Sequence, residues 1–386
     1  MTETQPAAAS GETHAAVRDR IDDHKMTAHD PKVAVSVIIP AFNAAATIRR
    51  ALESLQAQTL DAWEAIVVDD ASTDDLPAIV QGMAKDDARI RYVRNFQNTG
   101  PAESRNRGIA LAAGTWIALL DADDTFAAKR LNQLLSIAEA TNADAVSDNL
   151  LIVDQTNGSP RLLFGPDEFA TPRLMSLVEF VQGCAFDPQK PPRSSYTLMQ
   201  PMVRRSFIAE RRVAFPSNCR NGEDLIFNLN LLAAGARWVV TSAPMYTYFV
   251  TSGSLAEIIR DYDRHAMWGS VRALLRRRET RRDPLLAKSL RDFLQISHYL
   301  YWSGLIKQCI RQRSAATLLK CLVEDRSALL LFAREALHRS PRLFMRELTR
   351  LWHGPSGKAA PVGVGGSEAA VSSHAADGSS RAAEDM

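Results

Sequence analysis

Histidine is missing from the whole stretch between residues 32 and 250 of this 386-residue chain. The first three histidines lie at positions 14, 24 and 29, and the next one at position 265. A catalytic site in that stretch would have no imidazole base or ligand, which excludes Ser-His-Asp hydrolases and most zinc enzymes. Cysteine is also scarce: the four residues, Cys184, Cys219, Cys309 and Cys321, show no C-x-x-C spacing. We therefore expect neither a zinc site nor a disulfide framework, and a reducing, cytoplasmic location.

Long apolar runs are lacking too. The longest, Val33–Phe42, is far shorter than the ~18 residues that a membrane-spanning helix needs. The first twenty residues, MTETQPAAASGETHAAVRDR, do not have a charged start followed by an apolar stretch, so we expect no secretory signal. With 46% hydrophobic and 23% charged residues the composition is that of a globular protein, and the length suggests one large domain or two.

Charge is distributed unevenly along the chain. Residues 32–250 hold 21 Lys and Arg against 24 Asp and Glu, a net charge of −3. Residues 260–350 hold 20 against 9, a net charge of +11. A basic C-terminal third on an acidic body points to a polyanionic surface as a partner.

Short apolar segments alternate with helical patterns through the first half of the chain. This alternation predicts an α/β fold in which a parallel sheet is flanked by helices. The predicted strands are residues 33–39, 63–68, 90–93, 116–120 and 143–153, and the predicted helices are residues 44–57, 74–84, 101–113 and 127–141.

Polar motifs follow each of the first four predicted strands. They read Pro40-Ala41-Phe42-Asn43, Asp69-Asp70-Ala71-Ser72, Asn98-Thr99-Gly100 and Asp121-Ala122-Asp123-Asp124. Ligands of parallel sheets bind beyond the carboxyl ends of the strands, so these motifs should share one rim. Carboxylates grouped in this way repel one another and need a cation or hydrogen-bond donors.

Each acidic cluster has a plain structural alternative. Asp121 and Asp123 fit a hard-cation site completed by phosphate oxygens, but the same segment could simply cap the helix at 127–141. Asp69 and Asp70 fit acceptors for a nucleotide base or ribose, or a helix cap.

Two further motifs have the same ambiguity. Arg105, in the first turns of a helix, could bind an anion or be a solvated side chain near Glu103. Glu223 and Asp224, at the start of an apolar helix, could cap that helix or supply a general base at the mouth of an active site.

These motifs together resemble a known family. VSVIIPAFN, EAIVVDDASTDD, NTGPAESRNRGIALAAGTWIALLDADD and NGEDLIF are similar, in order and spacing, to the signatures of family 2 glycosyltransferases. The resemblance covers roughly residues 33–250, and the later part is similar to bacterial exopolysaccharide enzymes of the succinoglycan type. It implies a GT-A fold and transfer of one sugar from a nucleotide diphosphate, with inversion, to a saccharide or lipid-linked oligosaccharide acceptor.

The resemblance also implies roles for individual residues. Pro40 and Phe42 would pack on the nucleotide, Asp70 would bind the uracil of a UDP-sugar, and Asn43, Asp69 and Glu223 would complete the substrate site. Asp121 and Asp123 match the metal-binding D-x-D, which implies Mn²⁺ or Mg²⁺ as cofactor. Asp224 matches the catalytic base, and Arg105 the basic residue near the diphosphate or sugar. One departure is Tyr248-Phe249-Val250, where relatives often have a basic residue.

Two other enzyme classes are less compatible with the motifs. A sugar-1-phosphate nucleotidyltransferase should have a Gly-rich basic loop after its first strand, where this chain has PAFNAAA. An NAD-dependent enzyme should have G-x-G-x-x-G at that point, which is also missing.

The sequence predicts four segments. Residues 1–31 form a disordered arm, 32–252 the GT-A domain, 253–353 a basic helical region and 354–386 a disordered tail. The basic region has two interpretations: a helical subdomain packed on the transferase, or a surface that attaches to anionic lipid on the inner face of the membrane. No nucleic-acid partner is expected, because nothing aromatic accompanies the basic run at 276–278.

Overall fold

The computed structural model describes residues 33–155, 159–165, 167–185, 195–217, 219, 222–250 and 264–311. The predicted arm (1–31) and tail (354–386) lie outside these residues, and so do the predicted boundary at 252/253 and residues 312–353 of the basic region.

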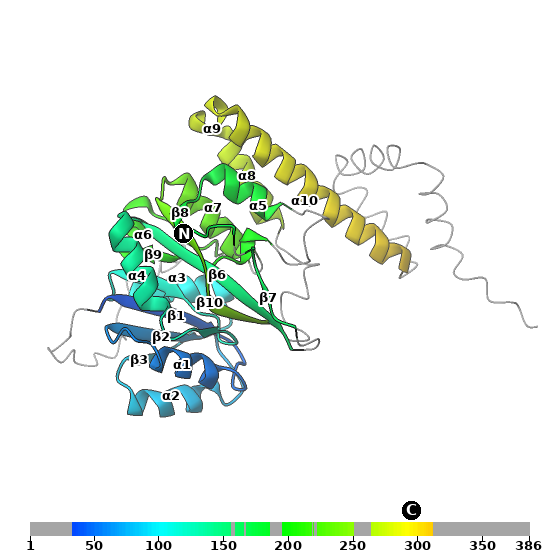
Figure 1. The fold of residues 1–386 in the computed structure, drawn as a ribbon. Helices are drawn as coiled ribbons and strands as arrows, with labels where there is room; N and C mark the ends of the chain where they lie inside the picture. Colours follow the sequence, from blue (N-terminus) through cyan, green and yellow to red (C-terminus); the bar gives the residue numbers. More distant parts are fainter. Residues whose placement is uncertain are drawn as a thin grey trace, which may run out of the picture. The chain divides into compact units, whose positions relative to one another are not determined.

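A single ten-stranded sheet organises the first part of the chain (Figure 1). Its order is β3-β2-β1-β4-β9-β6-β10-β5, with β7 on β6 and β8 on β10. The strands are β1 (Val35–Ala41), β2 (Trp63–Asp69), β3 (Ile90–Arg94), β4 (Trp116–Leu119), β5 (Thr125–Phe126), β6 (Ala145–Asp154), β7 (Arg161–Leu162), β8 (Arg173–Leu174), β9 (Met202–Arg204) and β10 (Trp238–Val250). The predicted α/β fold with a mostly parallel sheet is confirmed.

The strand register brings the carboxyl ends of the strands to one edge. Strand β1 pairs in parallel with β2 and β4, placing Ala41 beside Asp69 and Ile38 beside Leu119. Strand β9 runs antiparallel to both β4 and β6, so β6 and its parallel partner β10 point the same way as β4. The apolar runs of β1 and β2 are buried on both faces, as expected of strands covered by helices.

Among the described residues, four helices connect the strands of the first half: α1 (Ile48–Gln56), α2 (Leu76–Asp86), α3 (Pro101–Leu111) and α4 (Arg130–Thr141). They are followed by α5 (Leu177–Cys184), the 3₁₀ helix η1 (Tyr196–Leu198), α6 (Arg205–Arg211) and α7 (Glu223–Ala233). Helix α3 packs on β1 and β2. It approaches closely because Gly108 has no side chain: a Cβ there would lie 2.4 Å from Cγ2 of Ile38. This close packing places Arg105, one turn earlier, at the end of the sheet.

The alternative in which the segment after β4 caps a helix at 127–141 is wrong. Residues 125–126 form β5, which pairs with the end of β10, and α4 begins only at Arg130. The N-cap of α4 is Lys129, without a side-chain hydrogen bond. The carboxylates of Asp121, Asp123 and Asp124 are therefore not explained by capping.

The described part of the basic region consists of three helices, α8 (Arg264–Arg276), α9 (Arg278–Arg282) and α10 (Pro284–Arg311). The described part of this region is helical as predicted, and Leu274, Leu286, Leu290 and Phe293 are buried. Helix α8 packs on α7, and Gln182 of α5 donates to Ser289 of α10. No helix among the described residues is long and apolar enough to cross a membrane.

Candidate active site

A cavity of about 710 Å³ opens at the carboxyl ends of the strands, a size suited to a ligand of a few hundred daltons. Nine of the ten residues proposed from the sequence line it: Pro40, Phe42, Asn43, Asp70, Arg105, Asp121, Asp123, Glu223 and Asp224. The segments after β1, β2 and β4 thus meet the start of α7, which is more than a hundred residues further along the chain.

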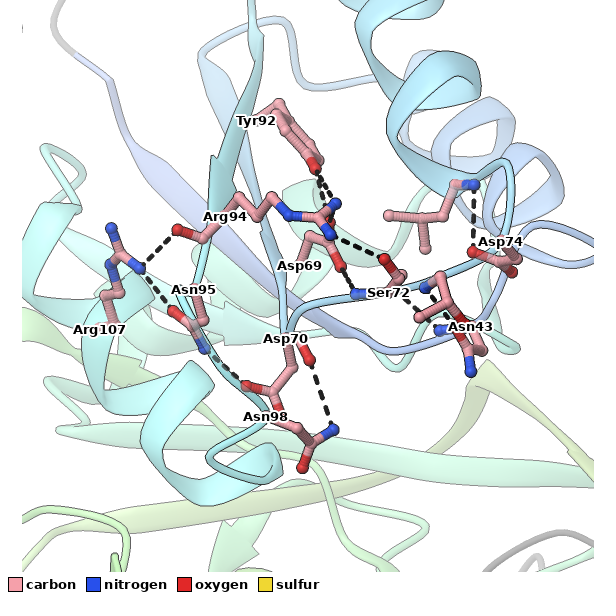
Figure 2. A network of polar contacts seen from close by, with 12 residues as sticks. Asn43, Asp69, Asp70, Ser72, Asp74, Tyr92, Arg94, Asn95, Asn98 and Arg107 are labelled. Carbon is pink, nitrogen blue, oxygen red and sulfur yellow. Dashed lines mark hydrogen bonds and ion pairs between the residues drawn. The ribbon is translucent and has the colours of Figure 1, made fainter.

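Asp69 is the exception. Its carboxylate is fully buried and is not part of the cavity lining. It accepts hydrogen bonds from the Ser72 backbone amide (2.8 Å) in the turn after β2, and from the Tyr92 hydroxyl and Arg94 Nη1 (2.8 Å) of β3 (Figure 2). We assign Asp69 to holding the turn after β2 rather than to binding a ligand.

Asp70 lines the cavity and also orders the loop after β3. Its Oδ1 accepts from the Thr99 amide (2.9 Å) and the Asn95 amide group (2.7 Å), and its Oδ2 accepts from the Gly100 amide (2.7 Å). Burial on its own would raise the pKa of Asp70, but these donors outweigh burial and hold the pKa below its usual value. Asp70 is therefore held as an anion in the cavity wall, and Figure 2 shows its contact with Asn95.

Phe42 and Asn43 form the part of the wall that follows β1. Asn43 has a left-handed backbone (φ 50°) and its Oδ1 accepts from the Thr73 amide at 2.8 Å. The backbone amide of Asn43 donates to Ser72 Oγ at 2.9 Å, and this bond connects the loops after β1 and β2 (Figure 2). Phe42 is 50% exposed, so an aromatic face is left open toward the cavity.

Arg105 is the buried cation at the centre of the site. Its Nη2 lies 2.8 Å from Asp121 Oδ1, and its Nη1 lies 2.6 Å from Glu223 Oε1 and 3.5 Å from Asp224 Oδ1. Burial would lower the pKa of Arg105, but the three carboxylates raise it well above its usual value. The alternative of a solvated side chain near Glu103 is wrong. Arg105 instead joins the loop after β4 to the start of α7.

Asp121 and Asp123 carry more negative charge than their surroundings neutralise. Burial, with a further contribution from Asp121, raises the pKa of Asp123 to about 6. Arg50 donates to the backbone carbonyl of Asp123 rather than to its carboxylate. Two neighbouring carboxylates with free oxygens are suitable donors for a hard cation such as Mg²⁺ or Mn²⁺.

The described residues contain no group of three His, Cys, Asp or Glu side chains that could hold a metal ion without other ligands. A site with two carboxylates is the kind that substrate phosphates complete. The third acid of the motif, Asp124, has another use. It is fully buried and accepts from the Tyr246 hydroxyl (2.7 Å) and the Phe249 amide (2.9 Å), which fixes the loop after β4 to β10.

Asp224 lies in the first turn of α7. The N-cap of this helix is Gly222, with φ 86°, and no side chain caps it with a hydrogen bond. Glu223 and Asp224 both lie in the first turn, where negative charge complements the helix dipole. Gln200 Nε2 donates to Asp224 Oδ2 at a long 3.4 Å, and Oδ1 accepts no hydrogen bond from the described residues. Burial, opposed by the charge of Arg105, raises the pKa of Asp224 to about 7. A carboxyl group of this kind is suited to proton transfer near neutral pH.

Sequence reasoning missed several residues of the cavity wall, notably Thr197, Leu198, Gln200 and Tyr246. The i, i+2 spacing of Tyr246 and Tyr248 on a strand is a signal that could have placed both tyrosines on one face. No pattern marks Gln200.

A basic side chain does reach the end of β10 despite the sequence Tyr248-Phe249-Val250: Arg50 of α1 lies 3.8 Å from the centroid of the Phe249 ring.

The cavity thus combines the acidic pairs Asp121/Asp123 and Glu223/Asp224 with an open aromatic face and a buried arginine. Comparison with known proteins identifies the family of the chain. Residues 36–183 match the model of glycosyl transferase family 2. The chain is 33% identical over 332 residues to the succinoglycan biosynthesis protein ExoO of Rhizobium meliloti, covering 85% of this chain and 92% of that protein. It is 34% identical to ExoU of the same species, covering 71% and 80%.

The chain therefore belongs to glycosyltransferase family 2. Among solved structures it resembles Staphylococcus aureus TarS 1–349 in complex with UDP-GlcNAc, with a TM-score of 0.59 at 18% identity, covering 83% of this chain and 90% of that one. The complex of TarS 1–349 with UDP gives 0.54 at 20% identity, covering 72% and 78%. These likenesses confirm the GT-A fold. Family membership also sets aside the nucleotidyltransferase alternative.

Proposed function

We propose that this enzyme transfers one sugar from a UDP-hexose to a saccharide acceptor, with inversion, in the synthesis of an exopolysaccharide or another surface polysaccharide. The observation that carries the proposal is the link between Asp121 and Asp224 through the guanidinium of Arg105, in a cavity that Asp123 also lines. Relatives in succinoglycan synthesis, and a neighbour of the same fold solved with UDP-GlcNAc, support the choice of substrate class.

The donor half of the cavity would consist of the loops after β1, β2 and β4. Phe42 offers its open face to the base beside Pro40 and Asn43, and Asp70 accepts from the base at the rim. Asp121 and Asp123 would hold a divalent cation, which, when bound, neutralises charge that develops on the leaving diphosphate. Arg105 keeps Asp121 in place through one carboxylate oxygen only, Oδ1.

The acceptor half would be organised around Asp224. The acceptor hydroxyl attacks the anomeric carbon as the bond to the diphosphate breaks, and Asp224 takes the hydroxyl proton. Attack on the face opposite the leaving group inverts the configuration. General-base assistance of this kind contributes ~10²–10⁴-fold to the rate. Gln200 and Arg105 orient the carboxylate but do not take the proton.

The acceptor class and location are also part of the proposal. A saccharide linked to a membrane lipid, presented on the cytoplasmic face, suits an enzyme of this kind. The catalytic domain would comprise residues 32–252, and the basic region would begin after it.

The test is a donor screen with UDP-, GDP- and dTDP-sugars, measuring release of the nucleotide diphosphate with and without Mn²⁺. We expect release from a UDP-hexose in the presence of the metal. Release from GDP- or dTDP-sugars alone would contradict the assignment of the donor, and no release from any sugar nucleotide would contradict the proposed activity.

We predict that Arg105→Lys lowers kcat/KM by about 10–100-fold. Lysine keeps the charge but cannot bridge Asp121 and Glu223 with a planar fork, so a buried carboxylate loses its partner, at a cost of ~1–3 kcal/mol. Steady-state transfer kinetics measure the loss. Arg107→Lys on the same helix is the matched control, since Arg107 bonds to the Arg94 carbonyl and Asn95 outside the cavity wall. Equal activity of the two variants would contradict the bridging role of Arg105.

A further inference from the structure

The corner where α8, α9 and the start of α10 follow one another presents a surface of one charge sign. Between residues 272 and 292 the chain has eight basic residues and three acidic ones. The basic residues, all of them exposed, are Arg272, Arg276, Arg277, Arg278, Arg281, Arg282, Lys288 and Arg291. We call this set the basic corner.

Most of the basic corner lacks acidic partners. Lys288 pairs with Asp292, and Arg277 donates to the Ala233 carbonyl. No ion pair to Arg276, Arg278, Arg281, Arg282 or Arg291 occurs among the residues that the structure describes. A solvated helix face normally mixes both signs through i, i+4 pairs. One or two cations in the last turn would suffice to complement a helix dipole, so the helix ends do not account for this cluster.

The same stretch of chain also has an exposed apolar side chain. Leu285, in the first turn of α10, is 57% exposed, whereas Leu286 beside it is buried in the core. Cations around an exposed apolar side chain are typical of surfaces that rest on the headgroups of anionic lipids.

The basic corner is connected to the catalytic residues by one helix. Arg277 bonds to the carbonyl of Ala233, the last residue of α7, and Asp224 lies in the first turn of that helix. Nine residues of α-helix span about 14 Å. A bilayer in contact with the corner would thus lie within reach of an oligosaccharide that extends from its lipid to the site.

We propose that the basic corner docks this enzyme on an anionic bilayer surface. The proposal rests on the proposed function only for the nature of the acceptor, because the docking itself requires no catalysis. The partner is the lipid surface and not a nucleic acid or an acidic protein.

The test is co-sedimentation of the full chain with phosphatidylcholine vesicles that contain rising fractions of phosphatidylglycerol. We expect binding to rise with the anionic fraction, and to fall when ionic strength increases from about 0.1 M to about 1 M and the Debye length falls from ~10 Å to ~3 Å. The triple variant R276E/R278E/R281E should partition about 100-fold more weakly, since each basic residue near the surface contributes about fivefold.

The control is R49E/K85E/R211E, which changes the net charge equally at exposed residues of α1, α2 and α6. It should bind vesicles like the wild type. In an assay without vesicles, both triple variants should release UDP from the UDP-sugar at the wild-type rate. This result would separate loss of docking from loss of the proposed activity. The proposal would be overturned if the protein did not bind vesicles even at low salt, or if binding did not depend on lipid charge. Equal binding by the two triple variants would also overturn it. Binding of a soluble acidic polysaccharide in place of vesicles would do so as well.

Discussion

Asp224→Asn is expected to lower kcat by ~10²–10⁴-fold, the usual contribution of a general base, while the KM for the nucleotide sugar changes little. The amide keeps the shape of the carboxylate and its contact with Gln200 but cannot accept a proton. Initial rates of UDP release at saturating and limiting donor measure both parameters. Asp86→Asn, the same chemical change at the exposed end of α2, should leave both unchanged.

A pH profile gives a second measurement of the same residue. Burial raises the pKa of Asp224 to about 7, and the base works only when deprotonated. Activity should therefore fall as pH decreases through about 7, and the residual activity of Asp224→Asn should lose that dependence. A variant that keeps more than about a tenth of the wild-type kcat would show that the base is elsewhere.

Asp123→Asn is expected to lower kcat/KM by more than about 100-fold and to weaken binding of the donor. Loss of residues that merely support a metal ligand already costs ~10–100-fold, so loss of a ligand should cost more. A chelator should abolish turnover of the wild-type enzyme, and excess Mn²⁺ should restore it. Asp61→Asn, at an exposed position before β2, is the control for the loss of one carboxylate.

The same substitution should raise the melting temperature of the ligand-free protein at pH 7. A carboxyl whose pKa is raised on folding costs stability that accumulates as pH rises from its unfolded pKa to its folded pKa, and the full cost remains above that range. The pKa of Asp123 rises from 3.8 to about 6, so the full cost applies at pH 7. A neutral amide removes this cost. Full activity in excess chelator, or a melting temperature lowered together with activity, would contradict the metal assignment.

The carboxyl ends of the first strands were predictable because local patterns determine them. Apolar runs buried on both faces mark β1, β2 and β4, and whatever follows a parallel strand lies on the same rim. The sequence could not separate Asp69 from Asp70, because adjacent residues at a strand end point to opposite sides and nothing local indicates which side faces the ligand. The structure directs Asp69 to Tyr92 and Arg94, and Asp70 to the loop at Thr99.

The connections across the site were not predictable from the sequence. Arg105 meets Asp121 across 16 positions and Glu223 across 118, and such pairings depend on tertiary packing rather than on any local pattern. The predicted helix at 127–141 started too early for a similar reason. Thr125 and Phe126 pair with β10, a strand more than a hundred residues away, and the Ala127 backbone amide also donates to the Met245 carbonyl of that strand. The helix therefore begins only at Arg130.

An anomalous difference map from crystals of the enzyme grown with UDP and Mn²⁺ would locate the metal and the nucleotide in one experiment. We predict a manganese peak at the carboxylates of Asp121 and Asp123 beside the diphosphate, with the uracil near Phe42 and Asp70 and with Asp224 free on the acceptor side. UDP bound outside this cavity, or bound inside it with the manganese at other residues, would contradict the account.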